Sequence, residues 1–198
     1  LLGTLIQRDD GGWDTSIRRL QLSDVTAHLT LGNLAATWQI HQGVIEPWSS
    51  LGDERSRVEI NGTLDGAPAR LEGTFTLAPP VPTGNGHVAI DDFALPRLSP
   101  ADSDHQWQGN GSIELDFQLA ADRDGRPQLS YDGTLRLRQL RTQNPAMQLQ
   151  SGAAVWTGQG TWQLSSQGLT FEQQGRWTLS DAGVTLADDR YHAADLVW

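Results

Sequence analysis

Apolar residues recur at every second position over most of this 198-residue chain. Such alternation is the signature of β-strands that are buried on one face. Turn residues separate the alternating stretches about every ten residues, and helical patterns are almost absent. We therefore predict an all-β protein of about twelve to fourteen strands, most of them joined as antiparallel hairpins.

Several of these strands carry a glycine within their apolar set. Val58, Ile60 and Leu64 alternate with Gly62, and the stretch 69–77 repeats the pattern around Gly73. Further members are Gly111, Gly133, Gly158, Gly160 and Gly175. Glycine inside a strand marks a bulge, a bend or a close approach. We expect one elongated, strongly curved antiparallel sheet, a half-pipe with little helix, whose apolar concave face is not tightly filled and has room for a ligand.

The alternation changes phase within two of the predicted strands, at Ser23–Asp24 and at Asp91–Asp92. A slip of one residue indicates a β-bulge or a turn. Hairpin turns are expected at Asp65–Gly66 and over residues 122–125 because these segments combine aspartate with glycine.

Two stretches interrupt the strand pattern. The first, PPVPTGN at 79–85, is expected to be a loop, and the second, PRLSPADSD at 96–104, contains the one expected helical turn, with Ser99–Pro100 at its start. Module boundaries are therefore possible near 79–86 and 96–106. The segments 58–77 and 113–137 share a layout of strand, acidic-glycine turn, proline and strand, so residues 1–198 read as one repeat-built domain. The single methionine is Met147, and we expect the chain to be a fragment of a longer protein.

Composition narrows the possible functions. The net charge of −10 argues against nucleic-acid binding, which requires a basic surface. The chain has no cysteine, so disulfides and thiolate metal ligands are unavailable. No apolar run approaches the ~18 residues of a membrane-spanning helix.

The sequence contains no convincing catalytic or metal-binding constellation. Asp122 and Asp124 begin like a calcium loop, but the remaining ligands are missing and a hairpin turn is favoured. Asp102, Asp104 and His105 fit a solvated acidic loop better than a metal site, because their spacing matches no ligand set. We therefore expect no enzymatic activity, no metal and no cofactor.

The apolar parity of the strands defines a candidate ligand surface. Core packing is the default interpretation of the tryptophans that share this parity, with ligand contact as the alternative. The expected groove-lining residues are Ile60, Leu64, Leu71, Phe75, Ile113, Leu115, Phe117, Leu135, Leu137, Trp162 and Trp177.

Three stretches carry a resemblance to a known family: GWDTSIRRLQL at 12–22, the glycine-bearing hairpin at 58–77, and the junction at 90–119 with its Leu-Pro and Leu-Ser-Pro steps. In these stretches the chain resembles the AsmA-like superfamily of bacterial envelope proteins, which includes TamB- and YhdP-type lipid-transport bridges, and within it a branch of uncharacterised domains.

The resemblance implies a non-enzymatic periplasmic module with a lipid-compatible groove. It implies acyl chains and flanking modules of the same protein as partners, a role in phospholipid transport and outer-membrane homeostasis, and an inner-membrane tether outside this chain. The alternative left open by the residues is a closed β-sandwich or barrel that binds carbohydrate or protein partners in the envelope. A purely structural spacer is a third interpretation.

Overall fold

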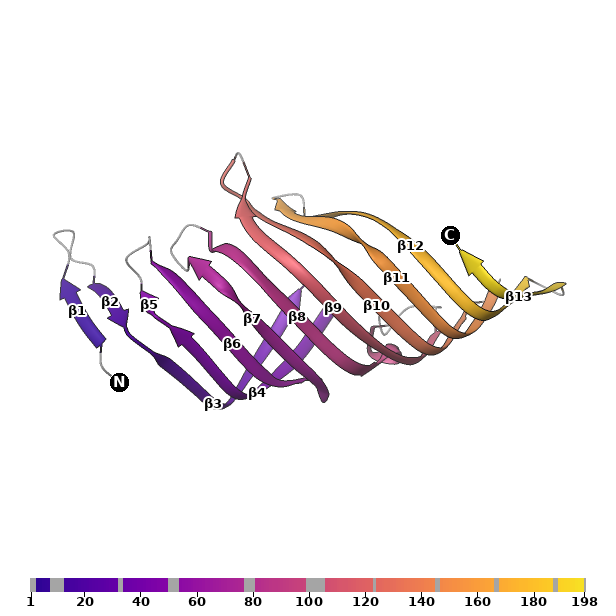
Figure 1. Ribbon diagram of the computed structural model, residues 1–198, viewed down its shortest axis with the longest axis horizontal. Helices are drawn as coiled ribbons and strands as arrows, with labels where there is room; N and C mark the ends of the chain where they lie inside the picture. Colours follow the sequence, from indigo (N-terminus) through magenta and orange to yellow (C-terminus); the bar gives the residue numbers. More distant parts are fainter. Residues whose placement is uncertain are drawn as a thin grey trace.

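The computed structural model describes residues 3–7, 13–31, 34–49, 54–76, 81–98, 106–122, 124–144, 147–165, 168–186 and 189–197. Within these ranges the chain forms thirteen strands and one short 3-10 helix, η1, and no α-helix (Figure 1). The all-β prediction and the expected number of strands are confirmed. The elements are β1 (Gly3–Gln7), β2 (Trp13–Ile17), β3 (Leu20–Leu31), β4 (Leu34–Glu46), β5 (Trp48–Ser49), β6 (Arg55–Leu64), β7 (Ala67–Thr76), β8 (Thr83–Ala94), η1 (Leu95–Leu98), β9 (Gln106–Ala121), β10 (Pro127–Gln143), β11 (Met147–Ser165), β12 (Gly168–Leu186) and β13 (Asp189–Val197).

Ten strands form a single antiparallel sheet in the order β3-β4-β6-β7-β8-β9-β10-β11-β12-β13. Strands β1, β2 and β5 form a separate three-stranded sheet. Because β3 and β13 do not pair with each other, the large sheet is open. The prediction of a curved, groove-like antiparallel sheet is confirmed, and the ten-stranded sheet is not closed into a barrel.

The β6–β7 hairpin shows how turn chemistry fixes this register. Asp65 and Gly66 both adopt positive φ, at 49° and 87°, as a two-residue type I′ turn requires. The backbone N–H of Thr37 on β4 donates to Asp65 Oδ1 at 2.8 Å, and the N–H of Asp65 donates back to the Thr37 carbonyl at 2.8 Å. The turn therefore also fixes the end of the hairpin against its neighbour.

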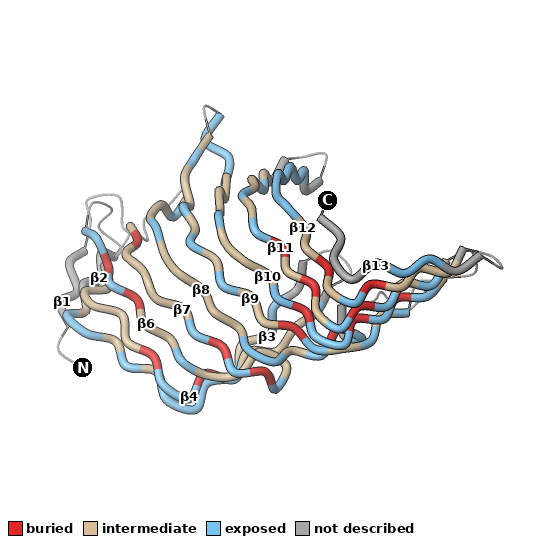
Figure 2. Tube along the Cα trace, turned by 45° about the vertical axis from the view of Figure 1, so that its right-hand side comes forward, coloured by how far each residue is buried: buried red, intermediate tan, exposed pale blue. Residues whose placement is uncertain are grey.

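The long strands bend along a line that crosses the sheet (Figure 2). Four strands carry a non-glycine residue in the left-handed region at this line: Asp24 on β3, Asp92 on β8, Gln139 on β10 and Asp181 on β12. At Asp92 and Gln139 the pairing with β9 shifts by a residue, which defines β-bulges. Bulges bend a strand and increase its local twist, so they account for the curvature.

The predicted phase changes coincide with irregularities: Asp24 adopts a left-handed φ without a shift in its register with β4, and the register of β8 with β9 shifts at Asp91–Asp92. The bulge on β10 was not predicted, although the apolar parity there changes from Leu137 to Leu140. The same signal was present on β12, where the parity changes after Leu179.

The main apolar cluster lies inside the bend. Leu137 and Leu140 stand on either side of the β10 bulge and pack together, so the apolar face is the concave one. In Figure 1 the far ends of β3 and β4 accordingly pass behind β7 and β8. The buried members of the cluster are Leu95, Leu137, Leu140, Ala154, Leu179 and Ala182, and Phe93, Trp107, Leu135, Leu149 and Trp177 pack against them.

The two stretches that interrupt the strand pattern differ from their expected structure or lie partly outside the described residues. Residues 83–85, expected to be loop, belong to β8, which pairs with β7 and β9 on its two sides. The 3-10 helix η1 ends at Leu98, just before the expected helical turn, and residues 99–105 lie outside the described residues.

Candidate functional site: the concave apolar face

The strand register arranges the apolar side chains in rows that run across the sheet. One row passes through Ala69, Ile90, Ile113, Leu135, Trp156 and Trp177 on six successive strands. The next row contains Leu71, Val88, Leu115, Gly133, Gly158 and Gly175. Directly opposed residues of an antiparallel pair lie on the same face. The rows therefore form a continuous apolar surface perpendicular to the strands.

All eleven predicted groove-lining residues share this face. Phe75 and Leu137 are buried, at 8% and 4% exposure, while Trp162 is 38% exposed. The other eight are half-buried. The structure thus brings the predicted residues onto one surface but divides them between the core of the bend and an accessible part.

The glycines on this face do not leave empty space. A Cβ built on Gly73 would meet Phe75 Cε2 at 2.7 Å, and one built on Gly86 would meet Phe117 Cζ at 2.8 Å. On Gly158 a Cβ would fall 2.7 Å from Trp156 Cζ2. The expectation of an unfilled face above the glycines is therefore wrong, because backbone atoms of the neighbouring strand and, at Gly73, Gly86 and Gly158, aromatic rings occupy the Cβ positions. This arrangement allows bulky rings to pack on a tightly curved sheet.

The rings also contact one another. Phe75 stacks on Phe117, with ring centroids 6.0 Å apart and an interplanar angle of 25°. Tyr131 packs edge-on against Trp162 at 6.1 Å and contacts Trp156 at 6.3 Å. Tyr131 and Trp156 were not among the predicted lining residues, although their strand parity indicated this face.

Several large apolar side chains remain accessible on this surface. Phe171 on β12 is 55% exposed and is directly paired with Trp162 on β11. Leu29 and Val25, on β3 at the opposite edge of the sheet, are 46% and 37% exposed. Among the described residues the main contacts of β11 and β12 are with their neighbours in the sheet. The concave face therefore combines a closed core at the bend with open apolar surface on β9–β12.

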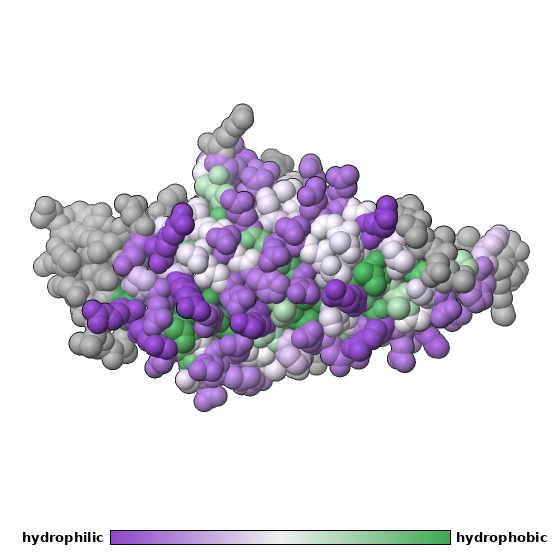
Figure 3. All heavy atoms as spheres, in the orientation of Figure 1, coloured by the Kyte–Doolittle hydropathy of each residue, from purple (hydrophilic) through white to green (hydrophobic). Residues whose placement is uncertain are grey.

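The outer face is polar (Figure 3). Ion pairs join neighbouring positions on it, including Arg57 with Glu59 and Arg70 with Glu72. At the bend, Asp92 Oδ1 accepts from Asn110 Nδ2 at 3.0 Å and from an Arg138 guanidinium nitrogen at 2.8 Å. This contact connects β8, β9 and β10 across the bulges.

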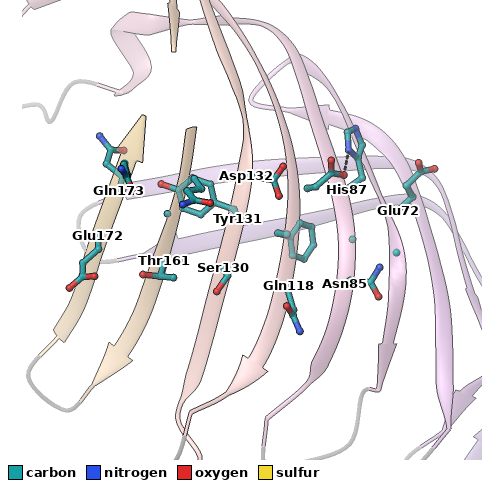
Figure 4. Close-up of a pocket in the computed structure, with 17 residues that line it drawn as sticks. Glu72, Asn85, His87, Gln118, Ser130, Tyr131, Asp132, Thr161, Glu172 and Gln173 are labelled. Atoms are coloured by element: carbon teal, nitrogen blue, oxygen red, sulfur yellow. Dashed lines mark hydrogen bonds and ion pairs between the residues drawn. The ribbon is translucent and has the colours of Figure 1, made fainter. Parts of the chain in front are cut away.

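A depression of about 920 Å³ lies across β7–β12. Its lining includes a row of Glu72, His87, Asp116 and Asp132 and a second row of Asn85, Gln118, Ser130 and Thr161 (Figure 4). These two rows have the parity of the outer, polar face, whereas Phe117, Tyr131 and Gln173, which also line the depression, have the parity of the concave face.

Within this polar depression His87 Nδ1 lies 2.9 Å from Asp116 Oδ1, and its Nε2 lies 3.9 Å from a Glu114 oxygen. No group of three or more His, Asp or Glu side chains suited to a metal ion occurs in the described ranges. Asp102, Asp104 and His105 lie outside those ranges.

The segment that resembled the start of a calcium loop forms the β9–β10 turn. Asp122 Oδ1 accepts from the backbone N–H groups of Asp124 and Arg126, each at 2.8 Å. The Gln163 side chain donates to Asp122 Oδ2 at 2.6 Å. The Arg126 backbone hydrogen bond, with help from Gln163 and Asp124, holds the pKa of Asp122 below its ordinary value despite some desolvation. The carboxylate therefore caps a turn.

The described part of the chain holds no helix of the length and apolarity that a membrane span requires. No protein-family model, curated protein or solved structure matches this chain.

Proposed function

We propose that this chain is a non-enzymatic module that shelters the acyl chains of lipids on its concave face, in a periplasmic assembly that moves phospholipid between membranes. The observation that carries the proposal is the continuous apolar surface across β7–β12, of which Leu71, Leu115 and Trp162 remain accessible.

The dimensions of this surface suit an acyl chain. Neighbouring strands lie about 4.8 Å apart, so the six strands β7–β12 span roughly 24 Å between the outermost two. An extended acyl chain of about sixteen carbons reaches about 20 Å, which covers about five of these six strands. A lipid tail lying along the row through Ile113 would meet an apolar side chain at each strand that it crosses.

The free energy of moving an acyl chain out of a bilayer depends on whether the apolar surface that receives it is uninterrupted. Transfer of each CH₂ into water costs about 0.8 kcal/mol, so the barrier to leaving a bilayer is dominated by the exposed tail. A row of half-buried apolar side chains lowers that barrier only if no polar group interrupts it. Ile90, Ile113 and Leu135, directly paired on β8, β9 and β10, supply such an uninterrupted set.

The experiment compares lipid recovery from two variants of β9. Leu115→Asp places a carboxylate within the apolar row, whereas Gln118→Asp places one on the outer face of the same strand. Both proteins are purified from the same host, checked by thermal unfolding and extracted for lipid mass spectrometry.

We expect both variants to unfold cooperatively, because half-exposed Leu115 leaves its substituent within reach of water. Leu115→Asp should lose most of the phospholipid that the unaltered protein carries, and Gln118→Asp should keep it. Equal lipid recovery from the two variants, or no lipid in the unaltered protein, would remove the proposal.

A further inference from the structure

Two rows of polar residues cross the neighbouring strands β9, β10, β11 and β12 on the far side of the β10 bulge. Directly opposed residues form the first row, which contains Gln108, Arg141, Gln150 and Gly183. The second row, two residues further along each strand, contains Gln106, Gln143, Gln148 and Thr185. The two rows together line a depression of about 570 Å³, which we call the Arg141 pocket.

The Arg141 pocket faces away from the apolar core. Thr142 and Leu149 also line it, but they alternate with the polar residues of their strands. Thr142 is 7% exposed, and Leu149 packs against the main apolar cluster, so both side chains point inward. Successive side chains of a strand point to opposite faces, so Arg141 and Gln150 point outward. The pocket is therefore separate from the surface proposed for lipid tails.

Gly183 accounts for part of the hollow. It occupies the last position of the first row and contributes no side chain there. A Cβ built on it would lie 3.1 Å from Gln150 Nε2, so the Gln150 carboxamide reaches into the space above the glycine. The first row is consequently open next to a polar group that can move.

Arg141 is the only charged residue that lines this pocket among the described residues. On the same strand, Arg136 and Arg138 form ion pairs with Glu114 and Asp92. Arg141 forms no such pair within the described ranges, and the five glutamine side chains around it form no hydrogen bonds there. In a protein of net charge −10, the pocket thus presents an uncompensated positive charge surrounded by neutral amide groups.

We propose that the Arg141 pocket binds the phosphate group of a small phosphorylated polyol. A guanidinium group offers a fork of N–H donors that matches the oxygens of a phosphate or a carboxylate. A carboxylate has only two oxygens, and the fork would use both. A tetrahedral phosphate has further oxygens, which can accept from the amide N–H groups of Gln108 and Gln150 on the two sides of Arg141.

The size of the pocket and its other amides indicate the rest of the ligand. A volume of about 570 Å³ is typical of a site for a small molecule rather than for a single ion. Each glutamine also has a carbonyl oxygen, which can accept from the hydroxyl groups of a polyol. Glycerol phosphate has this chemistry both as a free molecule and as the headgroup of a membrane lipid. The inference does not depend on the proposed lipid function, because the pocket and the apolar rows lie on opposite faces.

The test uses the whole chain and two probes. Calorimetry measures the binding of glycerol 3-phosphate, and flotation measures the binding of phosphatidylcholine vesicles with and without phosphatidylglycerol. Arg141→Gln removes the guanidinium group from the pocket, whereas the matched control Arg136→Gln removes the same charge from the same strand outside it. Gly183→Thr keeps the charge and fills the hollow. Thermal unfolding checks that each variant is folded.

We expect the unaltered protein and Arg136→Gln to bind with similar affinity. Arg141→Gln should bind about tenfold more weakly, because the charge-assisted hydrogen bonds of the guanidinium group are lost. Gly183→Thr should also bind more weakly, although the net charge is unchanged. Binding of glycerol 3-phosphate alone would assign the pocket to a free molecule. Binding of phosphatidylglycerol vesicles that is lost in Arg141→Gln would assign it to a lipid headgroup.

Three results would overturn the inference. Equal affinity of Arg141→Gln and Arg136→Gln would show that binding follows overall charge. Failure of the unaltered protein to bind either probe would show that the pocket has no affinity for phosphate. Binding of glycerol or inorganic sulfate as tight as that of glycerol 3-phosphate would show that the phosphorylated polyol is not recognised.

Discussion

Trp156 covers Gly175 on the neighbouring strand: a Cβ built on Gly175 would fall 2.7 Å from Cε2 of the Trp156 indole. Trp156 is only 6% exposed, so the ring cannot move away freely. The pair shows that the concave face depends on contact between glycine backbone and aromatic ring as much as on contact between apolar side chains.

Gly175→Ala should therefore destabilise the fold by about 1–3 kcal/mol, because the added methyl group forces Trp156 off its packed position. The matched control is Gly152→Ala, where the nearest atom to a new Cβ is an Asp181 oxygen at an ordinary 3.5 Å. Chemical denaturation of both variants measures the difference. A loss of stability at Gly152 equal to that at Gly175 would contradict the role assigned to the ring.

The buried core at the bend and the open apolar surface should lose different amounts of stability when a leucine side chain is shortened to alanine. Leu137 is buried in the bend, so Leu137→Ala should cost about 2–5 kcal/mol of unfolding free energy. Leu115 is half-buried, and Leu115→Ala should cost about 1 kcal/mol in lipid-free protein. Urea denaturation of delipidated samples provides the comparison. If both variants lost the same stability, the division into core and open surface would be incorrect.

Two buried serines should behave in opposite ways. Ser151 Oγ lies 2.7 Å from the Ala153 carbonyl and 2.8 Å from the Ser180 carbonyl, so Ser151→Ala removes a hydrogen bond between β11 and β12 and should cost about 1–2 kcal/mol. Ser56 is 1% exposed and its hydroxyl has no hydrogen-bond partner among the described residues. Ser56→Ala should leave the thermal midpoint unchanged or raise it. A clear drop on replacing Ser56 would reveal a partner for that hydroxyl.

The Asp122 turn should make stability depend on pH in the acid range. Hydrogen bonds lower the pKa of Asp122 in the folded state, so its contribution is present above the unfolded-state value and is lost as the pH falls through the folded value. Asp122→Asn should be less stable than the unaltered protein at neutral pH. The difference should shrink below about pH 4, as the aspartate of the unaltered protein is protonated. Denaturation midpoints measured across this range check the sign, and a constant difference would contradict it.

The alternation of apolar residues predicted the strands and which side chains share a face, because a pleated strand has a fixed period of two. The phase changes at Ser23–Asp24 and Asp91–Asp92 also predicted irregularities, since a bulge is the usual way to keep an apolar face continuous after a slip. The change in apolar parity from Leu137 to Leu140 on β10 likewise indicated a bulge, but that bulge was not predicted.

Whether other atoms fill the space above the glycines of the concave face could not be predicted from the sequence. Alternation places Gly73, Gly158 and Gly175 on the apolar side, but it does not say whether a ring from the same or the neighbouring strand lies over each one. That depends on side-chain rotamers and on local curvature.

The left-handed residues that bend the sheet recur on β8, β10 and β12, one for each hairpin of this half of the molecule. The position of the bulge along the strand sets the width of the trough, whereas the number of hairpins sets its length. Gain or loss of a whole hairpin would therefore change the reach of the protein and leave its cross-section the same. Deletion of a single residue at one bulge would instead change the cross-section and leave the length the same. It would move every side chain in the far half of that strand to the opposite face of the sheet.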